Sequence, residues 1–123
     1  MAEILFVFPK TGFELSKNTV ETPLSLLSLA STVAYDYDVK ILDQRVEKNF
    51  EELLLKHLNN CRFLFLSSMT GTQIKYALNV SAVAKNNSPA TVVWGGQHPT
   101  LFPEQTMSHA LVDCIAIGEG NTR

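Results

Sequence analysis

The residues of this chain whose types suit ligand binding lie between residues 91 and 100, in the run TVVWGGQHPT. The run opens as a short, apolar, β-branched stretch, which is typical of a buried strand, and it then reaches Gly95 and Gly96. Glycine allows another group to approach the backbone closely because it has no Cβ atom. The polar pair Gln97 and His98 follows. A buried strand that ends in such a loop is how open α/β sheets form ligand crevices; the alternative interpretation is a tight turn that needs glycine for backbone reasons alone.

Small and hydroxyl-bearing residues also follow three other predicted strands, at residues 9–12, 67–72 and 118–120. In an open parallel sheet, the loops after these strands leave from the same edge as the loop that holds Gly95, so we expect all four loops to converge. The loops are poor in charge. A site of this composition suits a bulky neutral ligand that packs against backbone and receives a few hydrogen bonds.

Strands and helices are predicted to alternate along the chain. The predicted strands cover residues 4–8, 39–42, 63–66, 91–94 and 114–117. Helices are expected to start at Thr22-Pro23, at Asn49, after Thr72 and at Pro103-Glu104. This alternation predicts an α/β fold with right-handed crossovers. We expect a flavodoxin-like (Rossmann-like) five-stranded parallel sheet of order 2-1-3-4-5, with helices on both faces.

The composition indicates one globular domain. The chain has 123 residues, of which 46% are hydrophobic, and this is enough for a single core. A net charge of −2 and the lack of long apolar runs argue against nucleic-acid and membrane partners. Cys61 and Cys114 fit no metal spacing, so we expect reduced thiols in a cytoplasmic protein. Residues 118–123 have turn chemistry, so we expect a piece of a longer polypeptide.

Several well-defined motifs are absent from the sequence. There is no dinucleotide-binding glycine pattern after the first strand and no P-loop, and neither a phosphoacceptor aspartate nor a flavin phosphate loop stands at the expected places. Ser67 and Ser68 lack the base that a serine nucleophile needs, and the histidines form no metal-binding pattern. His57 lies on the apolar side of the second predicted helix. We expect it to be a partly buried histidine with a hydrogen-bond partner rather than a ligand.

Four segments together resemble the amino-terminal cobalamin-binding domain of the class B radical SAM enzymes. The two specific segments are the Gly-Gly-x-His-Pro-Thr loop and the closing Gly-Glu-Gly, with Pro103-Glu104 and Val112-Asp113 between them. The others are the strand-Pro-x-x-Gly opening and the Thr-Pro-Leu-x-Leu-Leu-x-Leu-Ala first helix. The resemblance covers nearly the whole chain. Members of the family include cobalamin-dependent radical methyltransferases and the anaerobic magnesium-protoporphyrin monomethyl ester cyclase.

The resemblance implies that residues 1–123 are a domain that binds cobalamin in the base-off form, with the nucleotide tail detached and running between the loops after strands three and four. The hydroxyl groups of Ser67, Ser68 and Thr70 would face the tail, and Gly95 and Gly96 would let it pass. Residues 97–100 and 118–120 would line the corrin side. The residues that the resemblance marks as cofactor-binding are Pro9, Gly12, Ser67, Ser68, Thr70, Gly95, Gly96, Gln97, His98, Pro99, Thr100, Gly118, Glu119 and Gly120.

The resemblance also implies a partner within the same polypeptide. In relatives, a radical SAM domain follows and holds an iron-sulfur cluster and S-adenosylmethionine through a Cys-x-x-x-Cys-x-x-Cys motif. That motif is absent here, so this chain is not expected to be catalytic alone. The Asp-x-His-x-x-Gly motif that supplies a lower cobalt ligand in other cobalamin domains is also absent. His98 lies in a different loop, so we expect no histidine-ligated cobalt.

The implied function is to present the corrinoid to the downstream radical SAM domain, either for methyl transfer or for oxidative cyclisation. Two alternatives remain open: a ligand-free interaction domain of the same fold, and a small-molecule sensor that uses the same crevice. If the proposed tail path is correct, replacing Gly96 by Phe is expected to abolish cobalamin binding while leaving the fold intact.

Overall fold

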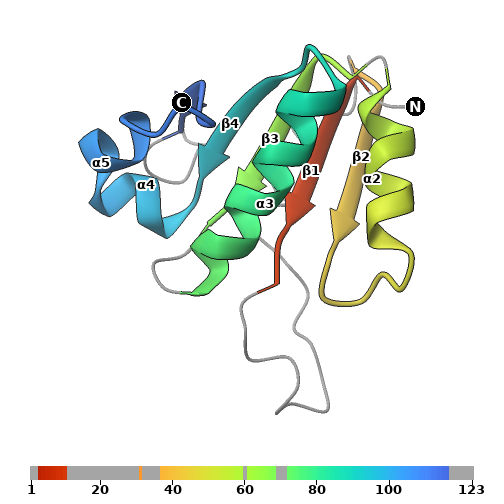
Figure 1. The fold of residues 1–123 in the computed structure, drawn as a ribbon, viewed down its shortest axis with the longest axis horizontal. Helices are drawn as coiled ribbons and strands as arrows, with labels where there is room; N and C mark the ends of the chain where they lie inside the picture. The colour runs from red at the N-terminus through yellow and green to blue at the C-terminus, as the bar shows by residue number, and fades with distance from the viewer. Residues whose placement is uncertain (1–2, 11–30, 32–36, 60, 69–71, 117–123) are drawn as a thin grey trace.

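The computed structural model describes residues 3–10, 31, 37–59, 61–68 and 72–116 and shows a five-stranded sheet. The strands are β1 (Ile4–Phe8), β2 (Val39–Asp43), β3 (Phe63–Ser67), β4 (Thr91–Gly95) and β5 (Cys114–Ile115). Their order is β2-β1-β3-β4-β5, and every neighbouring pair is parallel (Figure 1). The predicted flavodoxin-like α/β fold and its strand order are therefore confirmed.

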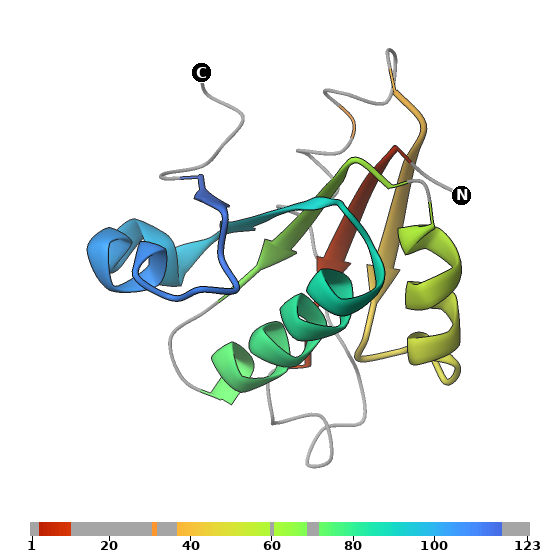
Figure 2. The same cartoon turned by 45° about the horizontal axis from the view of Figure 1, so that its top comes forward.

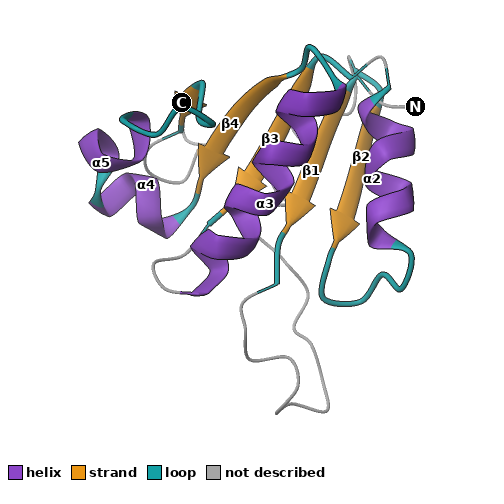
Figure 3. Cartoon of the chain, viewed as in Figure 1, coloured by secondary structure: helices purple, strands orange, loops and turns teal. Residues whose placement is uncertain are grey.

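Four helices are described: α2 (Phe50–Leu58), α3 (Thr72–Asn87), α4 (Gln97–Leu101) and α5 (Pro103–Met107). Figure 3 shows α2 and α3 on the same face of the sheet. The crossovers from β2 to β3 and from β3 to β4 run in the same direction across the sheet, so right-handed connections place both helices on that face. The short helices α4 and α5 lie beyond the end of β4 (Figure 2). The helix expected to start at Thr22-Pro23 lies outside the described residues.

The face of the sheet under α2 and α3 carries the main core. Alternate strand residues point to this face because side chains in a strand alternate between its two sides. The strand contribution is Leu5, Val7, Leu42, Leu64, Leu66, Val92 and Trp94, each almost completely buried. Leu54 and Leu58 of α2 and Ala77, Val80 and Ala84 of α3 pack onto them. Burial of apolar area on this face is the principal source of the fold's stability.

The opposite face of the sheet has a second apolar cluster centred on Phe6. Phe6 is 3% exposed, and its ring centroid lies 5.4 Å from that of Phe65 on β3. Partly buried side chains surround this pair, namely Ile4, Phe8, Val39 and Ile41. The two central strands are thus apolar on both sides, as the uninterrupted apolar sequences of β1 and β3 predict.

Three local features differ from the sequence-based expectation. Residues 97–101, expected as a loop, form α4, and Pro99 is tolerated because it lies in the first turn, where backbone N–H groups have no partner within the helix. The fifth strand covers Cys114–Ile115 and does not continue to Ala116, and residue 117 of the predicted strand lies outside the described residues. Asn49 precedes α2 as predicted, but its side chain makes no capping hydrogen bond.

His57 on α2 is more isolated than expected. Its side chain is buried with the core residues of α2, and Nδ1 has no hydrogen-bond partner among the described residues. The expectation of a hydrogen-bonded histidine is therefore wrong for this nitrogen. Burial lowers the pKa of His57, and the nearby positive charges of Lys40 and Lys56 lower it further. The neutral imidazole is the form that this environment favours.

The two cysteines are free thiols, as expected. Cys61 is buried and Cys114 is exposed. Burial raises the pKa of the Cys61 thiol, which keeps it protonated and unreactive. Among the described residues, no helix has the length and apolarity required to span a membrane.

Candidate functional site

The ends of β3 and β4 are fastened to each other by hydrogen bonds centred on Ser68. Ser67 lies opposite Gly95 in the sheet register. Both the backbone N–H and the hydroxyl of Ser68 donate to the carbonyl oxygen of Gly95, at 2.9 Å and 3.2 Å, and the N–H of His98 donates to the Ser68 carbonyl at 3.0 Å. Ser68 is fully buried. A ligand held near both strand ends must therefore lie on one face of the sheet or beyond Ser68, because the two loops are in direct contact at this residue.

The absence of a side chain at Gly95 makes room for the ring of Phe65. A Cβ atom built on Gly95 would lie 2.3 Å from Cζ of Phe65, far below any normal contact distance. The Phe65 ring therefore extends along the sheet, over the end of the neighbouring strand. The lack of a side chain at Gly95 thus accommodates an aromatic ring of the protein itself.

The backbone conformation at position 96 requires a glycine. Its φ angle is +98°, a conformation that residues with side chains rarely adopt, and a Cβ atom would lie 2.9 Å from the carbonyl oxygen of Ser68. Any side chain at this position would strain the turn. The expectation that Gly96→Phe leaves the fold intact is therefore wrong, and this variant does not separate binding from folding.

Ser67 carries a hydroxyl group that the described protein does not use. The residue is 9% exposed, and its hydroxyl has no hydrogen-bond partner among the described residues. Ser67 lies two residues after Phe65 on β3, so both side chains point to the face away from α2 and α3. Because it lies at the carboxyl end of a central strand and beside an aromatic ring, the Ser67 hydroxyl is well placed to bind a ligand.

The helix α4 brings the next predicted residues over the end of β4. Its His98 is buried, with its ring centroid 5.4 Å from that of Phe102, and burial lowers the pKa of this histidine. The Thr100 hydroxyl donates to the carbonyl of Gly96 at 2.9 Å, and Pro99 is buried. These contacts hold α4 against the turn at Gly96, so they have a structural role. The main chain of Gln97 begins the helix.

The residue after β1 is fastened by a side chain that sequence reasoning missed. Pro9 is almost completely buried, and its carbonyl accepts a hydrogen bond of 3.0 Å from Nε2 of Gln73, in the first turns of α3. Gln73 itself is 1% exposed. A buried glutamine near the start of a helix has no distinguishing spacing, so the sequence contained no signal for this contact.

A second unforeseen contact lies where β1 and β2 end. Arg45 donates to both carboxylate oxygens of Asp43, through Nε at 2.9 Å and through Nη2 at 2.8 Å. Its guanidinium lies 4.1 Å from the ring centroid of Phe8. This arrangement of a bidentate pair over an aromatic ring orders the β2 end of the edge.

The remaining predicted site residues lie outside the described part of the chain. They are Gly12, Thr70, Gly118, Glu119 and Gly120. The structure therefore brings together Pro9, Ser67, Ser68, Gly95, Gly96 and the α4 residues at one edge, but does not test the other loops. Within the described ranges, no group of three or more histidine, cysteine or acidic residues is placed to hold a metal ion.

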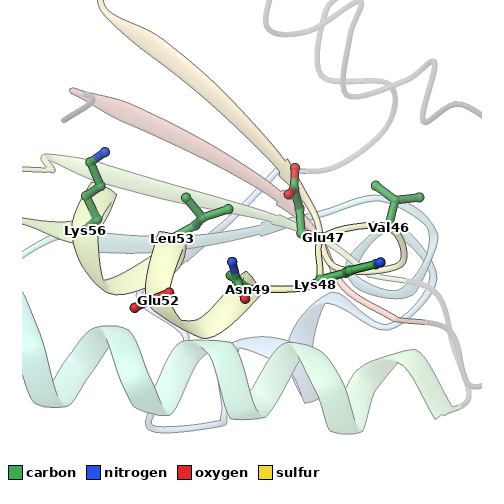
Figure 4. A pocket seen from close by; sticks show the side chains of 7 residues that line it. All are labelled: Val46, Glu47, Lys48, Asn49, Glu52, Leu53 and Lys56. Carbon is green, nitrogen blue, oxygen red and sulfur yellow. The ribbon is translucent and has the colours of Figure 1, made fainter.

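An open pocket of about 620 Å³ lies elsewhere, beside α2. Figure 4 shows it between the loop after β2 and the first turns of α2, with Glu47, Lys48, Glu52 and Lys56 among its lining side chains. Acidic and basic groups are equally represented there, and none of the predicted cofactor-binding residues lines it. This surface is not part of the candidate site.

A parallel α/β sheet of order β2-β1-β3-β4-β5, with two glycines at the carboxyl end of β4, is typical of α/β ligand-binding domains. Within that class, residues 16–123 match the model of the B12 binding domain. The chain belongs to this family. A methyltransferase from Pyrococcus horikoshii that is described as uncharacterized is 34% identical over 123 residues, an alignment that covers 96% of this chain and 27% of the relative. The chain thus spans about a quarter of the relative's length. No solved structure matches the chain significantly.

Proposed function

We propose that this chain binds cobalamin at the carboxyl ends of β3 and β4 and presents it to a radical SAM domain of the same polypeptide. The observation that carries the first half of the proposal is the match of residues 16–123 to the B12 binding domain. The position of the glycine-rich turn at the carboxyl edge of the sheet supports it, because ligands of open α/β sheets bind there.

The residues that would hold the cofactor lie on the face away from α2 and α3. The partly exposed ring of Phe65, which packs on the buried ring of Phe6, offers an apolar surface there, and the Ser67 hydroxyl adds one hydrogen-bonding group at its end. A largely apolar surface with a few polar groups that fix orientation is the usual composition of a small-molecule site. The described residues therefore fit a bulky cofactor on this face, with α4 as the adjacent wall.

The role of the bound cofactor would be to carry a transferable group, or to take part in oxidative cyclisation, at its cobalt. In this proposal the cobalamin is base-off, with no histidine of this chain on the metal, and the chain's own residues bind, orient and shield it. The radical SAM domain, with S-adenosylmethionine and its iron-sulfur cluster, would follow in the longer polypeptide. The description of the relative as a methyltransferase supports methyl transfer, and its greater length supports a further domain in the same polypeptide.

A second candidate function is a ligand-free interaction domain of the same fold. The specific observation in its favour is that the protein's own Phe65 ring fills the space that Gly95 leaves. If this ring blocks the site permanently, cobalamin has no access to the Ser67 hydroxyl. If the ring instead forms the floor of the site, its removal weakens binding.

A pair of matched serine variants tests the proposal. In Ser67→Ala, we expect weaker hydroxocobalamin binding, by about fivefold to tenfold, with stability within about 0.5 kcal/mol of wild type, because no protein hydrogen bond is lost. Ser68→Ala removes the hydroxyl bond to Gly95 and should cost about 1 kcal/mol of stability. Binding is measured by comigration in gel filtration and by the visible spectrum. Wild-type protein that elutes without cobalamin would contradict the proposal, and tighter binding after Phe65→Ala would show that the ring is an obstacle.

A further inference from the structure

Gln73 places a neutral polar side chain in a fully buried position near the start of α3. The residue is 1% exposed, and its Nε2 donates to the carbonyl of Pro9 at 3.0 Å across 64 positions of sequence. Glutamine is seldom buried unless its amide groups are paired, because an unpaired amide loses its hydration. A buried apolar side chain would fill the same volume without this requirement, so the amide has a role besides filling space.

The segment that Gln73 holds is also attached on its other side. Gln44, which follows β2, donates through its backbone N–H to the carbonyl of Phe8 at 2.9 Å, and its Oε1 accepts from the N–H of Lys10 at 3.0 Å. The backbone of residues 8–10 is thus held by one glutamine from each side. The two attachments differ in strength, because the Gln44 side-chain bond is exposed to solvent and the Gln73 bond is buried.

The position of this attachment in the sheet is the reason to connect it with ligand binding. The chain leaves β1 toward β2 on one side and leaves β3 toward β4 on the other, so the gap between β1 and β3 is the topological switch point. Ligands of open α/β sheets bind outside the carboxyl ends of the strands at such a point. Gln73, in the helix that follows β3, reaches across this point to Pro9, which follows β1.

We propose that Gln73 is a positioning residue that fixes the start of the loop after β1 relative to the end of β3, and so sets the width of the cofactor site. The ligand-binding part of this inference rests on the proposed function. The anchoring part concerns only the protein. In this arrangement Gln73 does not touch the cofactor; it acts through the Pro9 carbonyl.

Two variants of α3 separate this role from a general contribution to stability. Gln73→Met keeps a side chain of similar length without the amide, and Ser81→Ala removes another buried side-chain hydrogen bond from the same helix, the 3.0 Å bond to Nε1 of Trp94. The Ser81–Trp94 bond lies in the core between α3 and the sheet, on the face opposite to Phe65 and Ser67. Both variants lose a buried side-chain hydrogen bond, so each is expected to lose stability.

The first measurement is hydrogen exchange of the Lys10 amide in the protein without ligand, followed by NMR. In Gln73→Met, exchange of this amide should be about tenfold faster than in wild type, whereas Ser81→Ala should leave it unchanged after correction for global stability. Equal exchange in all three proteins, or equal acceleration in both variants, would overturn the anchoring role.

The second measurement is the affinity of the same three proteins for hydroxocobalamin. Gln73→Met should bind about tenfold more weakly, and Ser81→Ala should bind as wild type does. Wild-type binding together with unchanged binding by Gln73→Met would overturn the positioning role while leaving the proposed function in place. Failure of the wild type itself to bind would remove the proposed function and the ligand-positioning role together, and the exchange result would still decide whether Gln73 anchors the loop.

Discussion

Gly95 and Gly96 lack side chains for two different physical reasons. At Gly95 the space is occupied by the Phe65 ring of the neighbouring strand, and at Gly96 the backbone has a positive φ angle beside the Ser68 carbonyl. The sequence presents the two glycines as one motif, and the alternative of a turn that needs glycine for backbone reasons describes Gly96 well. A glycine pair at a sheet edge is therefore compatible with ligand binding without demonstrating it.

The contact between Gly95 and Phe65 gives a prediction for a double-mutant cycle. Gly95→Ala should destabilise the protein by about 1–3 kcal/mol, because the new Cβ lies 2.3 Å from Cζ of Phe65 and the ring must move. In a Phe65→Leu background, where the outer ring atoms are gone, the same substitution should cost much less. Urea unfolding of the four proteins measures the coupling. An identical cost of Gly95→Ala in both backgrounds would show that the ring is not the obstacle.

The element that sequence reasoning located least well is α4. Residues 97–101 contain a proline and follow two glycines, so their local pattern indicates a loop, yet Pro99 lies in the first helical turn, where a missing N–H is harmless. Strands β1, β3 and β4 were predicted within one residue, because uninterrupted apolar runs leave little choice of structure. Contacts such as the one between Gln73 and Pro9 could not be predicted from the sequence, since they depend on which elements meet in space.

The attachment of α3 to the sheet gives a prediction for this pair of elements. The Ser81 hydroxyl accepts a 3.0 Å hydrogen bond from Nε1 of Trp94, and both residues are buried. Ser81→Ala should cost about 1–3 kcal/mol, because the indole N–H is left buried without a partner. Asn79→Ala, at an exposed position of the same helix, should change stability by less than about 0.5 kcal/mol. Similar costs in chemical unfolding of the two variants would contradict the importance of this bond.

For the whole molecule, the sequence predicted the sheet order and the edge at which β1, β3 and β4 end. Alternation of strands and helices, with right-handed crossovers, allows few other arrangements. The candidate site was predicted less completely: the sequence indicated the residues of the β3 and β4 ends, but not that Ser68 would bond to Gly95 while Ser67 stays available. Side-chain direction depends on the register between strands, which one sequence does not determine.

The buried His57 gives the molecule a predictable response to pH. Burial lowers the pKa of His57 below its usual 6.5. As pH falls below 6.5, the unfolded chain takes up a proton before the folded one does, so the stability that depends on neutral His57 is full above this pH and is lost as pH falls through the folded pKa. His57→Leu should remove this component from the pH dependence of unfolding between pH 7 and pH 5, as measured with urea. An identical pH profile for the variant and wild type would contradict the assignment.

The most direct test of the central claim is an NMR titration of the isotopically labelled protein with hydroxocobalamin, which reports every backbone amide separately. If the carboxyl edge binds the cofactor, the amides of Ser67, Ser68, Gly95 and Gly96 should shift in a saturable manner. The amides of Glu47, Lys48 and Asn49 beside the α2 pocket, and that of Arg62 at the opposite end of β3, should stay in place. Saturable shifts confined to the α2 pocket, or no shifts at all, would contradict cobalamin binding at the ends of β3 and β4.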